Sequence, residues 1–429
     1  MIRLIAFLTA LAGALTLADL RGHTSAILLW APKLVASALA PWLTLTGALL
    51  AVLGLRRRDR LVAGAGLAGA ALAAGYVARV TAPHDAFEQA FGASWPAQIP
   101  TPLHQAMLSR RWSPYAPAAA ADVARNVPYG VHPETGKLLL ADLWQPPAGG
   151  MRSGLGVIYV HGGAWRLGEK DKGTRWLFGR LASQGHVIMD IDYTLAPTGA
   201  VAGMVQDVKR AIIWLKRNGD QYGVDGHRVA LIGGSAGGHL ALLAAYTPND
   251  PALQPDDSAV DTSLRAVVSF YGPADFIDMY EGTERTRQRI AQRKRIRPYG
   301  ALLESLLQRA GLAPPDAPIE QSRNYIAELL GADPEEDPDL YRQLSPLGRV
   351  GPHCPPTLLL QGTADIFGMG PSVRRLHHAL QAAGVPSLLV EFPRTDHGFD
   401  LALPQVSPAA QAAVYDVERF LALMSASVE

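Results

Sequence analysis

Residues 231–245 read "LIGGSAGGHLALLAA" and change rhythm at a serine flanked by four glycines. An apolar run leads into Ser235, and a run with helical spacing follows it. The pentapeptide "GGSAG" (233–237) fits G-x-S-x-G, in which a strained strand-to-helix turn exposes a serine hydroxyl for chemistry. This pattern alone is a weak signal, because a plain glycine turn that begins a helix has the same composition. The surrounding sequence must therefore decide between a structural and a chemical interpretation.

From residue 128 onward, apolar strand patterns alternate with helix patterns. The continuous Val, Ile and Leu runs are typical of strands in a parallel sheet that is buried on both faces. The predicted strands are 137–146, 154–163, 186–193, 228–234, 264–272, 356–362 and 387–393, and the predicted helices include 202–218, 371–383 and 408–424. This alternation predicts an α/β fold with a mostly parallel central sheet.

A second glycine motif, "HGGAW" (161–165), follows the strand pattern "GLGVIYV". Glycines at the end of a strand let backbone N–H groups approach a substrate oxygen, and acyl transfer needs such donors around the oxyanion. We expect the N–H groups of Gly163, Ala164 and Ala236 to form this oxyanion hole. His161 precedes the serine motif in the chain, and we interpret it as a structural residue that shapes the loop. The alternative is a glycine turn without a chemical role.

Two further motifs follow in the chain. The strand pattern "LLLQGTAD" ends with Asp365, and "RTDHGF" places His397 just after the last predicted strand. Histidine has a suitable pKa to deprotonate a serine, and a carboxylate can hold the imidazole in the right tautomer. Ser235, Asp365 and His397 each follow a strand, at the sheet edge where α/β proteins build their sites. Asp396 is the alternative carboxylate, but it is adjacent to the histidine and is expected to face away from its ring.

Together these motifs resemble the α/β-hydrolase superfamily, and within it the esterases and lipases related to hormone-sensitive lipase and to bacterial acetyl-xylan and feruloyl esterases. The resemblance covers about residues 128–425 and includes "DIDYTLAP" (190–197). It implies an α/β-hydrolase fold and a serine carboxylesterase. Ser235 would be the nucleophile, Asp365 the orienting acid and His397 the base, and no metal or organic cofactor is implied.

The sequence departs from the family pattern at two positions. Ala164 replaces the third glycine of the His-Gly-Gly-Gly motif but still offers its backbone N–H, and Gly234 stands where the lipase-like branch has Asp or Glu. The second departure, with "HGGAWRLGEKD", resembles branches such as plant isoprenylcysteine methylesterases, which are also membrane-attached. The expected substrate is therefore a small-molecule or lipid-like ester of open identity. A lipase, an amidase or peptidase with the same triad, and a non-catalytic hydrolase-like membrane module are the alternatives.

Three apolar stretches open the chain, at residues 4–18, 34–55 and 61–78. A membrane-spanning helix needs about 20 mostly apolar residues, so residues 1–82 predict a membrane region of two to three helices. The first stretch also fits a signal peptide, and a soluble hydrophobic helical domain is a further alternative. The loop "RRRDR" (56–60) carries four arginines and is expected in the cytoplasm. The catalytic domain would then lie on the extracytoplasmic side, periplasmic or extracellular.

The remaining segments complete the predicted organisation. Residues 83–127 are interpreted as a linker with room for a helix that packs on the following domain, and 128–429 as the catalytic domain. Within it, a charged, Pro-rich stretch at about 276–342 is predicted to form a cap over the site. With Trp165, this cap is expected to shape the substrate pocket. The basic run 284–298 fits a contact with anionic lipid or an acidic partner, but a solvated helix face is the preferred interpretation.

Composition excludes some classes of protein. The chain has 39 Lys and Arg residues against 38 Asp and Glu residues, so its net charge of +1 gives no reason to expect nucleic acid. A single cysteine, Cys354, excludes an internal disulfide and a thiolate metal cluster.

Overall fold

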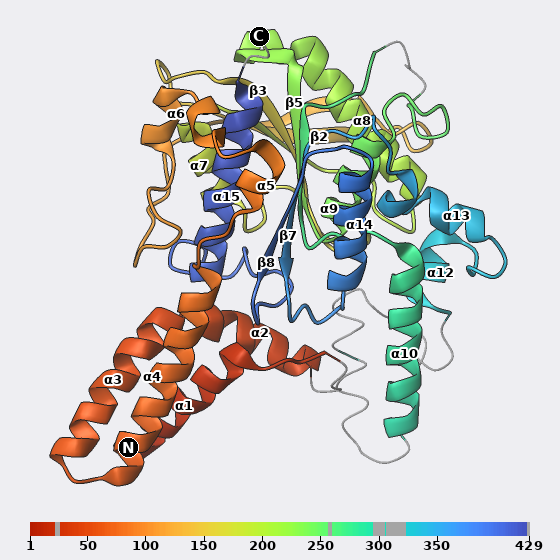
Figure 1. Ribbon diagram of the computed structural model, residues 1–429. Coiled ribbons are helices and arrows are strands. Elements are labelled where there is room, and N and C mark those ends of the chain that lie inside the picture. Colours follow the sequence, from red (N-terminus) through yellow and green to blue (C-terminus); the bar gives the residue numbers. More distant parts are fainter. Residues whose placement is uncertain (22–25, 256–259, 295–304, 306–322, 427–429) are drawn as a thin grey trace.

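A central β-sheet with helices on both faces organises most of the chain (Figure 1). The computed structural model describes residues 1–21, 26–255, 260–294, 305 and 323–426. In these residues the strands form one eight-stranded sheet of order β1-β2-β4-β3-β5-β6-β7-β8. Strand β2 is antiparallel to both of its neighbours, and every pair from β4 to β8 is parallel. The strands are β1 (Asp122–Val131), β2 (Leu138–Gln145), β3 (Gly154–Val160), β4 (Val187–Ile191), β5 (Val224–Gly234), β6 (Ala266–Phe270), β7 (Thr357–Gly362) and β8 (Ser387–Phe392).

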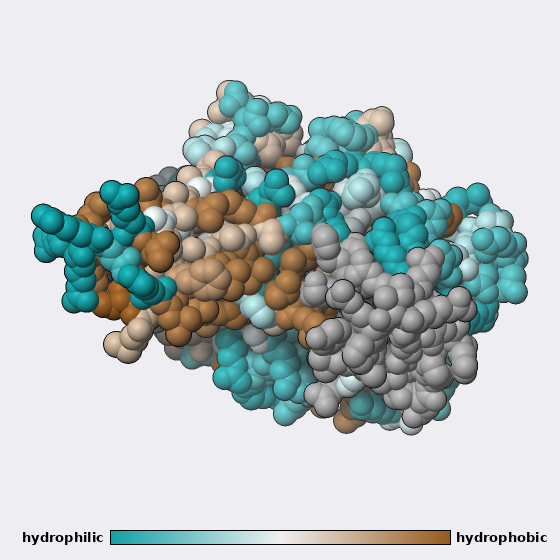
Figure 2. Space-filling view, turned by 90° about the horizontal axis from the view of Figure 1, so that it is seen from below, coloured by the Kyte–Doolittle hydropathy of each residue, from teal (hydrophilic) through white to brown (hydrophobic). Residues whose placement is uncertain are grey.

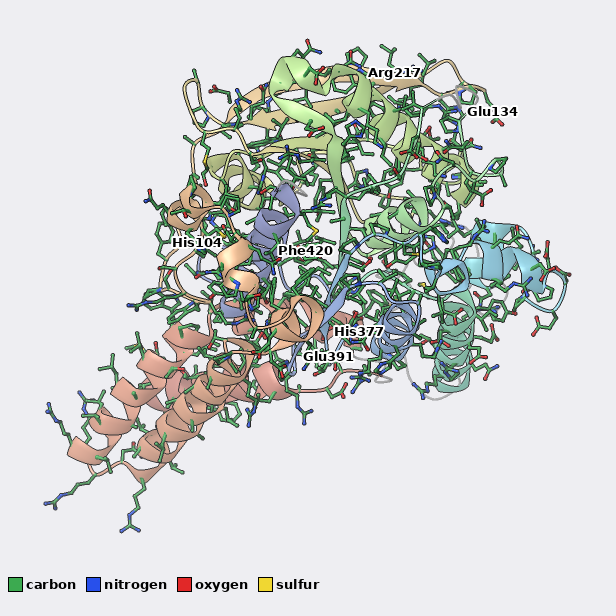
Figure 3. The ribbon with its side chains drawn as sticks, turned by 45° about the horizontal axis from the view of Figure 1, so that its top comes forward. His104, Glu134, Arg217, His377, Glu391 and Phe420 are labelled. Carbon is green, nitrogen blue, oxygen red and sulfur yellow. The ribbon has the colours of Figure 1, made fainter. Side chains whose placement is uncertain are left out.

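Each predicted strand is present, and the α/β fold with a mostly parallel sheet is confirmed. Helices α8, α9 and α14 cover one face of the sheet, and α7 and α15 cover the other (Figure 1). Phe420, labelled in Figure 3, lies on α15 and is fully buried in the second layer. The helices of the two layers are α7 (Arg175–Ser183), α8 (Val201–Asn218), α9 (Ala236–Tyr246), α14 (Gly370–Ala382) and α15 (Pro408–Ser425).

The segment 83–127 differs from the predicted linker. It forms α5 (Ala86–Phe91), a 3₁₀ helix η1 (Trp95–Gln98), α6 (Thr101–Ala106) and the first half of β1. It also contacts α15 and the turn before it: the Arg111 guanidinium pairs with Asp416 on α15, and the Trp112 indole donates to the carbonyl of Val406. β1 was not predicted because its pairing with β2 is interrupted by register shifts and its side chains are half exposed, so no regular alternation marks it.

The predicted cap lies between β6 and β7. Its described parts are α10 (Phe276–Lys294), α12 (Tyr325–Leu330) and α13 (Pro338–Gln343). Two 3₁₀ helices, η2 (Gly219–Tyr222) and η3 (Pro346–Arg349), precede β5 and β7. The first residues of the basic run 284–298 lie on α10, where Arg285 pairs with Glu281, and residues 295–298 are outside the described part of the chain.

The N-terminal helices form a separate bundle below the sheet (Figure 1). They are α1 (Ile2–Leu17), α2 (Ala26–Ala38), α3 (Ala40–Arg56) and α4 (Arg60–Val80). The predicted single helix 34–55 is wrong, because α2 and α3 meet at 74°. Pro41 lies in the first turn of α3; it has no N–H to donate back to α2, so α2 ends before it. As a result α2 lies across the end of the bundle, below the sheet, while α1, α3 and α4 run away from it (Figure 1).

Backbone contacts between glycines hold α1, α3 and α4 together. A Cβ atom added to Gly66 would lie 2.6 Å from the Ala51 nitrogen, and one added to Gly13 would lie 2.8 Å from the Gly69 carbonyl oxygen. Small residues at such positions let helix backbones approach closely, as is common in membrane bundles. Among the described residues, α4 is the one single helix long and apolar enough to cross a membrane, and α2 with α3 passes the same test as a bent pair. α1 is a shorter apolar helix.

Two glycines of α4 provide a direct test of this packing. Gly66→Ala places a methyl group against the α3 backbone, whereas a Cβ at Gly64 meets nothing within 4 Å. We expect Gly66→Ala to destabilise the full chain by about 1–3 kcal/mol, and Gly64→Ala to be neutral or slightly stabilising, since alanine favours helix. Thermal unfolding of both variants in detergent measures the difference. Equal melting temperatures would contradict the close packing of α3 on α4.

Candidate active site

Ser235 occupies a sharp turn between β5 and α9. Its backbone has φ 55° and ψ −123°, a conformation rare for a residue with a side chain. The turn is possible because its glycines approach other backbone atoms: a Cβ at Gly237 would lie 2.0 Å from the Val160 carbonyl oxygen, and one at Gly233 would lie 2.2 Å from the Gly237 carbonyl oxygen. The serine is also the N-cap of α9, where the helix dipole favours developing negative charge.

The structure brings Ser235, His397 and Asp365 together in one hydrogen-bonded row. His397 Nε2 lies 2.9 Å from Ser235 Oγ, and His397 Nδ1 lies 2.9 Å from Asp365 Oδ2. The three residues follow the carboxyl ends of β5, β8 and β7; β7 and β8 are neighbours, and β6 separates β5 from β7. His397 and Asp365 are almost fully buried, with 5% and 1% of their surface exposed. Such an arrangement can pass the serine proton to the imidazole, with the carboxylate facing the resulting charge.

Asp365 is held by its own neighbours. Its Oδ2 also accepts a hydrogen bond from the Gln361 side-chain amide, and its Oδ1 accepts one from the N–H of Phe367. Asp396, the alternative carboxylate, points away from the imidazole as expected from the sequence: its Oδ1 accepts from the N–H groups of Ile366 and His397. Of the two carboxylates, Asp365 is therefore the one that contacts the ring.

The glycine loop 161–165 lies beside the serine. A Cβ added to Gly162 would lie 3.2 Å from the Ser235 Cβ, so the loop backbone passes directly along the turn. Gly163, Ala164 and Trp165 have φ values of 129°, 53° and 60°. Positive φ is unfavourable for the latter two residues, and such strain is concentrated at functional loops. Ala236, the third predicted donor, begins α9 directly after the serine.

His161 and Trp165 support this loop from within the fold. The His161 ring stacks on Tyr193 at 4.5 Å, and the Tyr193 hydroxyl donates to the His161 carbonyl. Burial lowers the pKa of His161, which favours its neutral form. Trp165 was predicted to line the substrate pocket, but its side chain is 2% exposed and packs against Phe276 and His239. In this structure the indole lies in the core under the loop.

His239 links the loop to the segment before β7. The Trp165 indole N–H donates to His239 Nδ1, and His239 Nε2 donates to the carbonyl of Leu344. These partners require the neutral ring with its proton on Nε2. Burial lowers the pKa of His239 to about 4, in keeping with that assignment.

Several residues near the site were not found from the sequence. The Tyr325 hydroxyl on α12 donates to the Ala164 carbonyl, so α12 is bonded to the glycine loop. The rings of Tyr271 and Phe367 lie 4.3 Å and 4.7 Å from the His397 ring, measured between centroids. Tyr271 also donates to Asp400, whose pKa burial raises to about 6. These single aromatic residues belong to no motif, so nothing in the sequence marks them.

Helix α2 also reaches the site. The Trp30 indole N–H donates to the carbonyl of His397, and Lys33 Nζ lies 3.0 Å from Asp396 Oδ2. The sequence places this lysine directly before the predicted apolar segment 34–55, where it reads as a loop charge and nothing marks Asp396 as its partner. A lysine in such a place normally has a buried partner or reaches for water.

Comparison with known proteins agrees with this geometry. Residues 141–310 match the family model described as BD-FAE. The chain is similar to the esterase LipQ of Mycobacterium tuberculosis, with 31% identity over 68% of this chain and 61% of the relative. It is also similar to the probable carboxylic ester hydrolase LipM of the same organism, with 32% identity over 69% and 60%. The chain thus spans about three fifths of the length of these curated relatives.

Among solved structures, the chain is similar to esterase B from Lactobacillus rhamnosis, with a TM-score of 0.52 and 20% identity over 73% of this chain and 89% of that one. At this identity the likeness concerns the fold, and it supports the expected α/β-hydrolase architecture.

The lowered pKa of His239 predicts an acid-sensitive fold. Below the ordinary histidine pKa of 6.5 the unfolded chain binds a proton, whereas the folded chain does not until about pH 4. The stabilisation is therefore complete above pH 6.5, and roughly 2–3 kcal/mol of it is lost as the pH falls to about 4. We expect the stability difference between the wild type and His239→Gln to shrink over this range in denaturant unfolding.

The exposed His227 provides the control. His227→Gln shows how far the loss of a histidine outside the core changes the free energy of unfolding. A His239→Gln difference that is independent of pH would contradict the buried neutral ring.

Proposed function

We propose that this protein hydrolyses carboxylic esters through an acyl-enzyme. The chain belongs to the α/β-hydrolase superfamily, and within it to the carboxylesterase group related to hormone-sensitive lipase. The observation that carries this proposal is the row from Ser235 through His397 to Asp365, with both hydrogen bonds at 2.9 Å. The esterase relatives support the same reaction class.

In the proposed mechanism, Ser235 Oγ attacks the ester carbonyl while His397 Nε2 takes its proton. Asp365 keeps the Nδ1 proton in place and stabilises the imidazolium. His397 then protonates the leaving alcohol. In the second half of the reaction, water attacks the acyl-enzyme while His397 takes its proton, and the acid and free Ser235 are released. The buried position of the base and the acid keeps these charges in a low dielectric, where their interactions are strong.

The negative oxygen of the tetrahedral intermediate would be bound by the N–H groups of Gly163, Ala164 and Ala236. The strained backbone of the glycine loop, its contact with the serine turn and the Tyr325 bond to Ala164 support this assignment. Donors fixed before the reaction need no reorganisation when the charge forms, which is the main source of their effect.

We further propose that residues 1–82 anchor the enzyme in a membrane, with 83–127 as the connecting segment and 128–429 as the catalytic domain. Apolar side chains cover the outer surface of the bundle, and Figure 2 shows this surface continuing toward the hydrolase part. The most exposed are Leu4, Phe7, Leu8, Leu11, Leu45, Leu49, Val52, Leu55, Leu61 and Leu67. α4, at 21 residues, is about 30 Å long, the thickness of a bilayer core.

The charges at the ends of the bundle support an extracytoplasmic catalytic domain. The α3–α4 turn with its four arginines (56–60) lies at the end farthest from the sheet, beside the N-terminus, where Arg3 pairs with Asp59 (Figure 1). Arginine-rich short loops remain in the cytoplasm. With α1, α3 and α4 crossing in turn, the hydrolase lies on the opposite side.

The chemistry predicts a strict dependence on Ser235. In the full chain in detergent, Ser235→Ala should lower hydrolysis of p-nitrophenyl esters at least about 10³-fold, as for other triad knockouts. It should also abolish labelling by a fluorophosphonate. Ser183→Ala, on α7 and outside the site, is the matched control. An acetyl-to-palmitoyl series separates a small-ester esterase from a lipase, and equal activity of Ser235→Ala and the wild type would refute the proposed nucleophile.

The proposed orientation is tested by cysteine labelling, because the single natural cysteine is buried. Glu134 lies on the hydrolase surface away from the bundle, and Figure 3 labels it. A membrane-impermeant maleimide should label Glu134→Cys on intact spheroplasts, and Arg58→Cys only after permeabilisation. The reverse pattern would place the catalytic domain in the cytoplasm.

A further inference from the structure

We infer that helix α2 is a positioning element for the catalytic base, with Trp30 and Lys33 holding the loop that carries His397. This inference rests on the proposed function, since it assigns these residues to the same site. It gives the N-terminal region a role beyond attachment: a tether needs no contact with the active site, whereas α2 contacts both loops that form it.

Trp30 contacts the base through its backbone and its ring. The indole Nε1 lies 2.9 Å from the carbonyl oxygen of His397. The indole also packs edge-on against Phe367 at 5.7 Å, and Phe367 in turn packs edge-on against the imidazole. The histidine is therefore held at its carbonyl by a hydrogen bond from α2, and its ring is held by aromatic contacts that begin on α2.

Lys33 acts through Asp396. The two side chains form an ion pair at 3.0 Å, and neither is exposed. The second carboxylate oxygen of Asp396 accepts from the N–H of Ile366 at 2.8 Å and from the N–H of His397 at 2.9 Å. One carboxylate thus joins the loop after β7, which carries Asp365, to the loop after β8, which carries His397. Lys33 is the cation that compensates its buried charge.

A third contact supports the same loop from the bundle. The Tyr76 hydroxyl on α4 lies 3.2 Å from Thr395 Oγ1, two residues before His397. Three side chains of the N-terminal region therefore contact the segment 395–397. Displacing a catalytic group by about 1 Å can cost roughly 10²-fold in rate, so the rate of acylation should depend on these contacts.

Trp30→Phe tests the positioning without removing the aromatic packing. In the full chain in detergent, we expect kcat for a short, water-soluble p-nitrophenyl ester to fall about 5- to 30-fold. Values are expressed per active site, with the sites counted by fluorophosphonate labelling, and KM should stay within about 2-fold. Trp42→Phe on α3, whose indole is exposed, is the matched control and should behave as the wild type.

The ion pair is tested by loss and rescue. Lys33→Met leaves a buried carboxylate without its cation, and its kcat per active site should fall at least as far as that of Trp30→Phe. Adding Asp396→Asn removes the unpaired charge but keeps the oxygen that accepts from Ile366 and His397. The double variant should therefore recover most of the lost rate and of the lost melting temperature.

The outcomes separate this inference from the proposed function. If the wild type is active but Trp30→Phe keeps its full kcat per site, α2 does not position the base. Full activity of Lys33→Met would likewise overturn the role of the ion pair. If the wild type itself neither hydrolyses esters nor reacts with the fluorophosphonate, the proposed function is wrong.

Discussion

The close approach of β3 and the start of α9 is the constraint on which the site depends. Gly237 has no side chain, so the first turn of α9 can lie against the carbonyl of Val160 at the end of β3. This contact places Ser235 at the top of β5 and brings the loop 161–165 along its side. The proposed nucleophile and the backbone that would bind the oxyanion are thus arranged by one backbone contact between β3 and the helix that follows its neighbour β5.

His397, the proposed base, is held differently, by side chains from several parts of the chain. Asp365 forms a hydrogen bond with one ring nitrogen of His397, and Trp30 donates to the His397 carbonyl. The rings of Tyr271 and Phe367 pack against the imidazole. Loops after strands are less constrained than the strands themselves. A histidine on such a loop needs contacts from outside it, and the N-terminal helices supply part of them.

The sequence predicted the local motifs and the residues that the sheet topology brings to one edge. Ser235, Asp365 and His397 follow strands of the same parallel half of the sheet, at the same edge, so their proximity could be expected from order and motif. The contacts of Trp30 with His397 and of Lys33 with Asp396 span 367 and 363 positions and belong to no repeating pattern. Strand β1 and the bend before Pro41 were missed because irregular pairing and a single proline leave little periodic signal.

The burial of Asp396 against Lys33 also bears on how such a protein can be divided or recombined. A hydrolase cut free at residue 82, or joined to an unrelated anchor, would carry the carboxylate but not its cation. The boundary that is plain in the sequence is therefore not a boundary between independent modules. The N-terminal helices and the sheet domain are expected to be inherited and exchanged as one unit, with changes at positions 30 and 33 matched by changes in the loops that they contact.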